Sequence, residues 1–124
     1  MSSENKLIVL VLETCGPIAN NLKVIIEKYY HQLEVKICAN GEEIIEETKH
    51  SEIYLIISVL EKIGKMNGLE LLAKIKDESP KTKFLTIAGD NCNVTEITEA
   101  GADGFVEKPY TVNILLKTIN KVLN

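Results

Sequence analysis

Carboxylate, hydroxyl and ammonium side chains stand at or just after the apolar segments of this chain, where together they could bind a metal ion or a phosphorylated group. They are Glu13, Ser58, Glu61, Thr86 and Lys108. Mg²⁺ usually takes its protein charge from more than one carboxylate, so a single Glu13 after aliphatic residues predicts no metal site. Ser58 has neither a metal nor an evident base, and we interpret it as a strand residue whose hydroxyl bonds the backbone. We therefore predict no catalytic residues and no enzymatic activity.

The composition argues against several other kinds of site. The chain has 124 residues and a net charge of −4, and its basic residues include no arginine. Bidentate guanidinium recognition of phosphate is therefore unavailable, and the scattered lysines form no basic stripe for nucleic acid. The cysteines and histidines lack the spacing of metal ligands, so we interpret the three cysteines as reduced thiols. These are Cys15, Cys38 and Cys92.

The length and the hydropathy pattern set the expected organisation. No apolar run approaches the roughly 20 residues of a membrane-spanning helix, and the polar start has no signal-peptide core. We expect a cytoplasmic protein without membrane contact. Residues 1–124 are expected to form a single domain with no output domain after it, either as a stand-alone module or as a piece of a longer protein.

Five apolar segments alternate with five amphipathic segments. Continuous apolar runs are typical of strands buried on both faces of a parallel sheet, and the expected strands include 7–12, 54–59, 83–88 and 104–106. Residues 33–37 alternate between apolar and polar, which predicts a shorter strand nearer an edge of the sheet. Between them the apolar residues recur at helical spacing, with Pro17 at one helix start and Gly101 at one helix end. Asn91 or Asn93 is expected to cap the fourth helix, and the last helix is expected over 110–123. The pattern predicts a parallel α/β sheet with right-handed crossovers.

Three segments resemble the receiver domain of response regulators. They are 40–43 (Asn-Gly-Glu-Glu), 66–72 (Met-Asn-Gly-Leu-Glu-Leu-Leu) and the Thr86-to-Pro109 interval with its Ala-Gly-Ala-Asp turn. The resemblance covers essentially the whole chain and implies a flavodoxin-like (βα)5 fold with strand order 2-1-3-4-5. It implies that Thr86 reaches toward a phosphoryl group, that Lys108 pairs with its oxygens and that Phe105 reports activation. It also implies a cis peptide before Pro109 and a turn capped by Asp103.

The residues that receive the phosphoryl group in the family have no counterpart here. Counting from the two flanking motifs places the acceptor at Val59 or at Leu60, and neither is a carboxylate. The acidic pair that holds Mg²⁺ in the family falls on Val11 and Leu12, or includes Glu13 if the following loop is one residue longer. The resemblance therefore implies an atypical receiver, or pseudo-receiver, without a cofactor or a metal.

We expect such a domain to act through phosphorylation-independent protein–protein contacts, with a signalling partner or as a homodimer. The expected contact face is the fourth helix, fifth strand and fifth helix, with Glu96, Glu99, Phe105, Tyr110 and Lys117. Either Glu13 or Glu61 could pair with Lys108, although a solvated loop position is the plainer interpretation of Glu61. Thr86 could keep a switching role or make a structural hydrogen bond.

Two other functions stay open. The first is phosphorelay signalling through a relocated acceptor or an altered metal site near Glu13 and Glu61. The second is a flavodoxin-like module for a small ligand. The first strand-to-helix turn, 13–17, contains one glycine and no phosphate-cradling pattern, which argues against nucleotide or flavin binding there.

Overall fold

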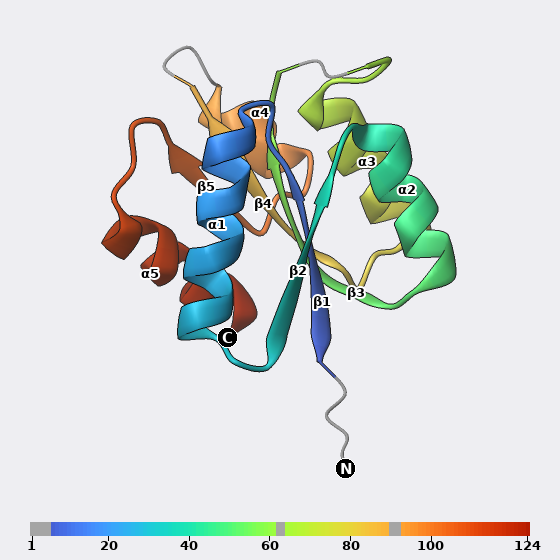
Figure 1. The fold of residues 1–124 in the computed structure, drawn as a ribbon. Coiled ribbons are helices and arrows are strands. Elements are labelled where there is room, and N and C mark those ends of the chain that lie inside the picture. Colours follow the sequence, from blue (N-terminus) through green and yellow to red (C-terminus); the bar gives the residue numbers. More distant parts are fainter. Residues whose placement is uncertain (1–5, 62–63, 90–92) are drawn as a thin grey trace.

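A single parallel sheet organises the chain (Figure 1). The computed structural model describes residues 6–61, 64–89 and 93–124. The strands are β1 (Leu7–Leu12), β2 (Leu33–Cys38), β3 (Ile53–Val59), β4 (Lys83–Ala88) and β5 (Gly104–Glu107). The helices are α1 (Gly16–Tyr29), α2 (Gly41–His50), α3 (Gly68–Glu78), α4 (Val94–Glu99) and α5 (Val112–Leu123). The strand order is β2-β1-β3-β4-β5, as the resemblance implied.

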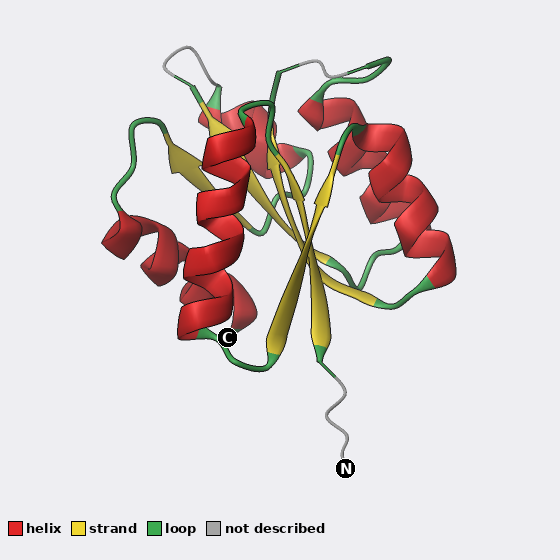
Figure 2. Ribbon diagram, in the orientation of Figure 1, coloured by secondary structure: helices red, strands yellow, loops and turns green. Residues whose placement is uncertain are grey.

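Helices cover both faces of the sheet (Figure 2), so the inner strands are buried on both sides. Side chains of successive strand residues point to opposite faces, and this alternation produces two apolar cores. One core packs α1 and α5 on the sheet through Leu22, Ile26, Leu115 and Ile119. The other packs α2 and α3 through Ile44, Leu71, Leu72 and Ile75. Continuous apolar strand sequences are therefore explained by burial on two faces rather than one.

Side-chain caps fix where the helices begin. The side chain of Asn40 accepts a hydrogen bond from the backbone N–H of Glu43 at the start of α2. Asn67 and Glu70 form a reciprocal capping box at the start of α3, and Asn93 caps α4 through the N–H of Glu96. Of the two expected caps of α4, Asn93 is confirmed, while position 91 lies outside the described residues.

Four boundaries and one contact differ from expectation. Strand β5 extends one residue further, to Glu107, which pairs with Ala88 of β4. Strand β2 extends to Cys38 and β3 begins at Ile53, because both residues pair in the β1 ladders. Helix α5 begins at Val112, because the Thr111 hydroxyl accepts a hydrogen bond from the N–H of Ile114 and caps the helix there.

Gly101 follows α4 with a φ of 104°, the left-handed conformation that glycine adopts readily, which confirms the expected helix end.

Asp103 has contacts beyond the turn that it was expected to cap. Its Oδ2 accepts hydrogen bonds of 2.8 Å from the backbone N–H of Phe84 and from Nζ of Lys76. The carboxylate therefore joins the turn before β5 to the start of β4 and to α3. The contact holds β4 and β5 in register at the end opposite the candidate site.

Candidate functional site

The carboxyl ends of the parallel strands bring the candidate residues to one edge of the sheet, the upper edge in Figure 1. One register row crosses four strands and contains Leu12, Ser58, Thr86 and Phe105. Glu13 and Val59 come one residue after this row, and Lys108 follows three residues after Phe105. In sheets of this kind, the crevice beyond the strand ends is where ligands and chemistry are usually found.

Glu13 is a buried carboxylate at the end of β1. Its side chain is 1% exposed. One oxygen, Oε2, accepts hydrogen bonds of 3.1 Å from the hydroxyl of Thr14 and from the backbone N–H of Cys15. The other oxygen, Oε1, lies 3.7 Å from Nζ of Lys108. The first turn after β1 therefore folds around Glu13 and aims its free oxygen at the ammonium.

Lys108 reaches this carboxylate from the loop between β5 and α5. Its backbone N–H donates a 2.8 Å hydrogen bond to the carbonyl of Ala88, which fixes the loop on the end of β4. The peptide bond between Lys108 and Pro109 is cis, as the resemblance implied. Of the two partners considered for Lys108, Glu13 makes the ion pair among the described residues. The sequence left Glu13 and Glu61 open as partners of Lys108, and the place of Glu13 in the fold decides between them.

Two buried oxygen atoms at this edge have no hydrogen-bond partner within the described part of the chain. They are Oε1 of Glu13 and Oγ1 of Thr86. The 3.7 Å separation from Lys108 is an electrostatic contact, longer than a hydrogen bond. The structural hydrogen bond considered for Thr86 is therefore absent among these residues. Unsatisfied buried polar groups are uncommon, so these two atoms distinguish this edge of the sheet from the apolar core beneath it.

A cavity of about 650 Å³ opens beside the ion pair, lined by Ile18, Gly89, Lys108, Pro109 and Tyr110. Tyr110 is half-buried in its wall. Burial raises the pKa of the Tyr110 phenol above its ordinary value, and the negative charge of Glu13 adds to the shift. The cavity thus combines an ammonium with largely apolar walls.

The end of β3 contains no carboxylate. The Ser58 hydroxyl donates a 2.9 Å hydrogen bond to the carbonyl of Val59, in agreement with its interpretation as a structural residue. Val59 is fully buried in the core under α1 and α5, whereas Leu60 is half-buried. The carbonyl of Leu60 accepts a 3.0 Å hydrogen bond from the N–H of Gly68, and a Cβ atom on that glycine would lie 2.5 Å from the carbonyl oxygen of Val59. The backbone at the end of β3 is therefore pressed against the start of α3.

Glu61 lies on the exposed side of the same edge. Its Oε2 is 3.5 Å from the Thr14 hydroxyl, which also bonds Glu13, so Thr14 links the two carboxylates. This link was not expected from the sequence, because 47 residues separate Thr14 from Glu61. The spacing gives no signal for it, and only the sheet register brings the two loops together.

These residues do not fit a Mg²⁺ ion, the metal that an acidic pair holds in the family that the sequence resembles. Glu13 already accepts two hydrogen bonds on one oxygen and faces an ammonium with the other. Residues 6–61, 64–89 and 93–124 contain no group of three or more acidic, histidine or cysteine side chains that could hold a metal. Among the described residues, Glu13 is the carboxylate that the structure places against Lys108, and one carboxylate paired with an ammonium is a poor ligand set for Mg²⁺.

Comparison with known proteins identifies the family. A model described as the response regulator receiver domain matches residues 9–120. The chain belongs to this family. The receiver domain is 26% identical to the chemotaxis protein CheY of Thermotoga maritima over 116 residues, which are 92% of this chain and 95% of that protein. It is also 29% identical over 105 residues to the autoinducer 1 sensor kinase/phosphatase LuxN of Vibrio campbellii, where the match covers 82% of this chain but only 12% of LuxN.

Solved structures agree with this assignment. A CheY-like receiver domain from Methanospirillum hungatei has a TM-score of 0.84 and 27% identity, covering 95% of this chain and 94% of its own. The chemotaxis regulator CheY4 of Vibrio cholerae has a TM-score of 0.84 and 24% identity, covering 95% and 99%. The receiver domain therefore has the CheY-like flavodoxin fold of two-component response regulators. In the described part of the chain, no helix is long and apolar enough to cross a membrane.

The residues expected on one partner face of this receiver domain fall into two groups. Phe105 lines a hollow of about 310 Å³ with Thr98 of α4 and Thr118 of α5. Tyr110 and Lys117 instead line hollows shared with α1, one at each end of the α1–α5 seam. Glu96 and Glu99 are exposed on α4. The face predicted from the family resemblance therefore spans two surfaces that meet along α5.

The thiols of the receiver domain play no part at this edge that the structure shows. Cys15 and Cys38 are free cysteines, and position 92 lies outside the described residues. Burial raises the pKa of the Cys38 thiol to about 12. Cys38 is consequently protonated and unreactive at neutral pH.

Proposed function

We propose that this receiver domain transmits a signal through phosphorylation-independent contacts with protein partners. One observation carries the proposal. Lys108 faces the buried carboxylate of Glu13, and the residues at the end of β3, Val59 and then Leu60, are both aliphatic. Phosphoryl transfer to a carboxylate needs an acceptor and a metal ion that offsets the developing charge. Val59 and Leu60 supply no acceptor, and Val11 and Leu12 supply no metal ligand.

The Glu13–Lys108 pair supports a second part of the proposal. The family resemblance implies that Lys108 binds phosphoryl oxygens, which are present only after phosphorylation. Here a carboxylate of the chain itself lies 3.7 Å from the ammonium. The pair would act as a fixed substitute for that transient anion. Any switching must then come from a partner that binds one conformation more tightly than another.

The partner surface in this proposal is formed by α4, β5 and α5. Phe105 is half-buried there beside a shallow hollow, with Thr98 on one side and Thr118 on the other. An aromatic ring partly open to solvent is a common anchor in protein interfaces. Residues 1–124 act as one domain in this proposal, without a catalytic role or a cofactor, and the partner is a signalling protein or a second copy of the chain.

Intact-mass spectrometry tests the central claim. The chain is incubated with acetyl phosphate and Mg²⁺, and its mass is expected to stay unchanged. A receiver with an aspartate at the end of its third strand, treated in parallel, controls for active reagent. A gain of one phosphoryl group on this chain would refute the proposal, and the modified peptide would identify the acceptor.

A second candidate function is phosphorelay through an altered cation site, and one observation favours it. Thr14 links Glu13 with Glu61, so two carboxylates approach each other at the sheet edge. Titration of isotope-labelled protein with Mg²⁺ distinguishes the candidates. The phosphorylation-independent proposal expects no saturable shift of the amides at these three residues, whereas the phosphorelay candidate requires one.

A further inference from the structure

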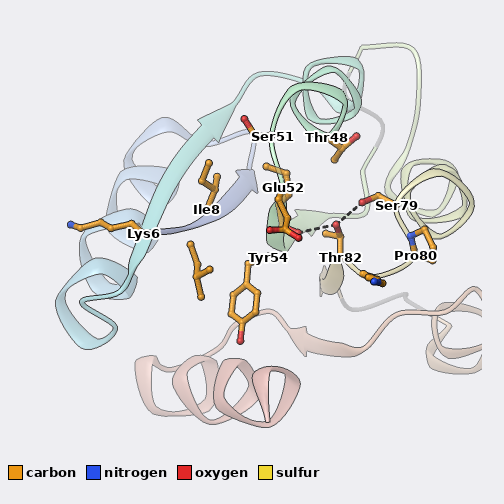
Figure 3. A pocket seen from close by; sticks show the side chains of 12 residues that line it. Lys6, Ile8, Thr48, Ser51, Glu52, Tyr54, Ser79, Pro80 and Thr82 are labelled. Carbon is orange, nitrogen blue, oxygen red and sulfur yellow. Dashed lines mark hydrogen bonds between the residues drawn. The ribbon is translucent and has the colours of Figure 1, made fainter. Parts of the chain in front are cut away.

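A second cavity lies at the opposite edge of the sheet, at the amino ends of β1, β3 and β4 (Figure 3). Its volume is about 820 Å³, within the range of small-molecule sites in proteins. Three chain segments line it: 6–8, 48–54 and 79–82. None of the residues discussed at the carboxyl edge contributes to it.

A strand irregularity accompanies the hollow. Between β1 and β3, Ile8 pairs with Ile53 and Val9 pairs with Leu55, so Tyr54 is skipped. Such bulges re-aim side chains and are frequent beside binding sites. Tyr54 is half-buried and lines the cavity together with Ile8. The bulge therefore gives the cavity an aromatic ring in its wall.

The floor of the cavity is rigid. Thr82 is 2% exposed, and its hydroxyl donates a 2.9 Å hydrogen bond to the carbonyl of Ile53. The hydroxyls of Ser79 and Thr82 lie 2.7 Å apart, and Figure 3 shows these two bonds as a continuous chain. Side chains that are already held by hydrogen bonds lose less conformational entropy when a ligand binds.

The charges around the cavity favour an anion. Lys6 and Lys81 line it and make no ion pair among the described residues, whereas Glu52 is the one carboxylate in its lining. In Figure 3, Lys6 points away from the other side chains, so Lys81 is the stronger candidate for contact. The wall residues Ile8, Tyr54 and Pro80 are apolar or aromatic.

We propose that this cavity binds small anions that carry a flat apolar ring, with the ring against Tyr54 and the anionic group near Lys81. The site is independent of the Glu13–Lys108 pair. It gives the receiver domain a ligand site at the amino ends of the strands, whereas phosphoryl chemistry in the family takes place at the carboxyl ends. Glu52 opposes the anion and sets an upper limit on its affinity.

Three probes separate the features of the site. Phenyl phosphate combines ring and anion, benzyl alcohol has the ring alone, and inorganic phosphate has the anion alone. Each is titrated into isotope-labelled protein while amide chemical shifts are recorded. Phenyl phosphate is expected to bind most tightly and to shift the amides of Ile8, Tyr54 and Thr82.

Three variants then test the assignment of charge. Lys81→Ala is expected to weaken phenyl phosphate binding about threefold, as for an exposed charge pair, and to leave benzyl alcohol unchanged. Glu52→Gln is expected to tighten phenyl phosphate about twofold, a gain that loss of folding cannot imitate. Lys108→Ala, at the opposite edge, is expected to have no effect. Shifts that map to Lys108, or equal binding by wild-type protein and Lys81→Ala, would overturn the inference without touching the proposed function.

Discussion

Replacing Lys108 with methionine is expected to destabilise the fold by about 2 kcal/mol. Nζ lies 3.7 Å from Oε1 of Glu13, whose side chain is 1% exposed. At this separation an effective dielectric constant of about 20 gives a gross attraction of about 4 kcal/mol. The Lys108 side chain is 35% exposed, so water screens the pair and we discount the attraction by about half. Methionine keeps most of the aliphatic stem, so the loss reports the charge rather than the packing.

Urea denaturation followed by circular dichroism measures this loss. For a small domain, about 2 kcal/mol corresponds to a midpoint lower by about 1 M urea. Lys117→Met on α5 is the matched control, because Lys117 is exposed and has no ion pair among the described residues. Its effect is expected to stay within about 0.5 kcal/mol.

A double-mutant cycle with Glu13→Gln isolates the pair. Lys108→Met alone leaves a buried carboxylate oxygen without any partner, which is the costly outcome for a buried charge. Once Glu13 is uncharged, the same lysine substitution is expected to cost less, with a coupling of about 1–2 kcal/mol. Strictly additive effects, or a Lys108→Met variant as stable as Lys117→Met, would refute the view that this ion pair holds the carboxyl edge together.

Two further predictions concern the same edge. Because burial and then the charge of Glu13 raise the pKa of Tyr110, its contribution to stability is constant below about pH 10 and falls as the pH rises beyond that value. In Glu13→Gln the pKa of Tyr110 is expected to move back toward its ordinary value, while the part of the shift that burial causes remains. Ultraviolet absorbance of the tyrosinate measures this pKa, and Tyr110→Phe identifies the signal of Tyr110. An unchanged Tyr110 titration would contradict the contact with Glu13. Gly68→Ala is expected to cost about 2 kcal/mol, since its Cβ would lie 2.5 Å from the Val59 carbonyl oxygen, whereas Gly16→Ala has open space and is expected to be neutral or slightly stabilising in thermal unfolding. Equal melting temperatures for the two alanine variants would show that the β3–α3 junction yields without cost.

The order and nature of the elements could be predicted because each depends on local sequence. Runs such as 7–12 and 54–59 are apolar at every position or nearly so, as strands covered on both faces must be. Asn93 and Gly101 mark the ends of α4 through capping and backbone preferences that act over a few residues. The last helix was expected to start at Tyr110, whereas Thr111 caps it and its first residue is Val112.

The site itself depends on contacts between distant segments, and sequence spacing does not encode them. Glu13 lies at the end of β1, yet its ion-pair partner Lys108 comes from the loop after β5. At the opposite end of the sheet, the bond between Lys76 and Asp103 likewise joins residues 27 positions apart that meet only when the sheet is assembled. Contacts between distant segments also divide the expected partner face. Because α5 packs against α1, Lys117 lies on a different surface from Phe105.

The burial of Val59 limits which side chains the end of β3 can accommodate. Val59 is fully enclosed beneath α1 and α5, and the junction with Gly68 leaves its backbone little room to turn. An aspartate introduced there would place a charge in an apolar core before any metal site existed to receive it, at a cost of several kcal/mol. The Val59→Asp substitution is therefore expected to destabilise the fold, as measured by urea denaturation. A Val59→Asp variant with unchanged stability would show that the end of β3 can accommodate a carboxylate.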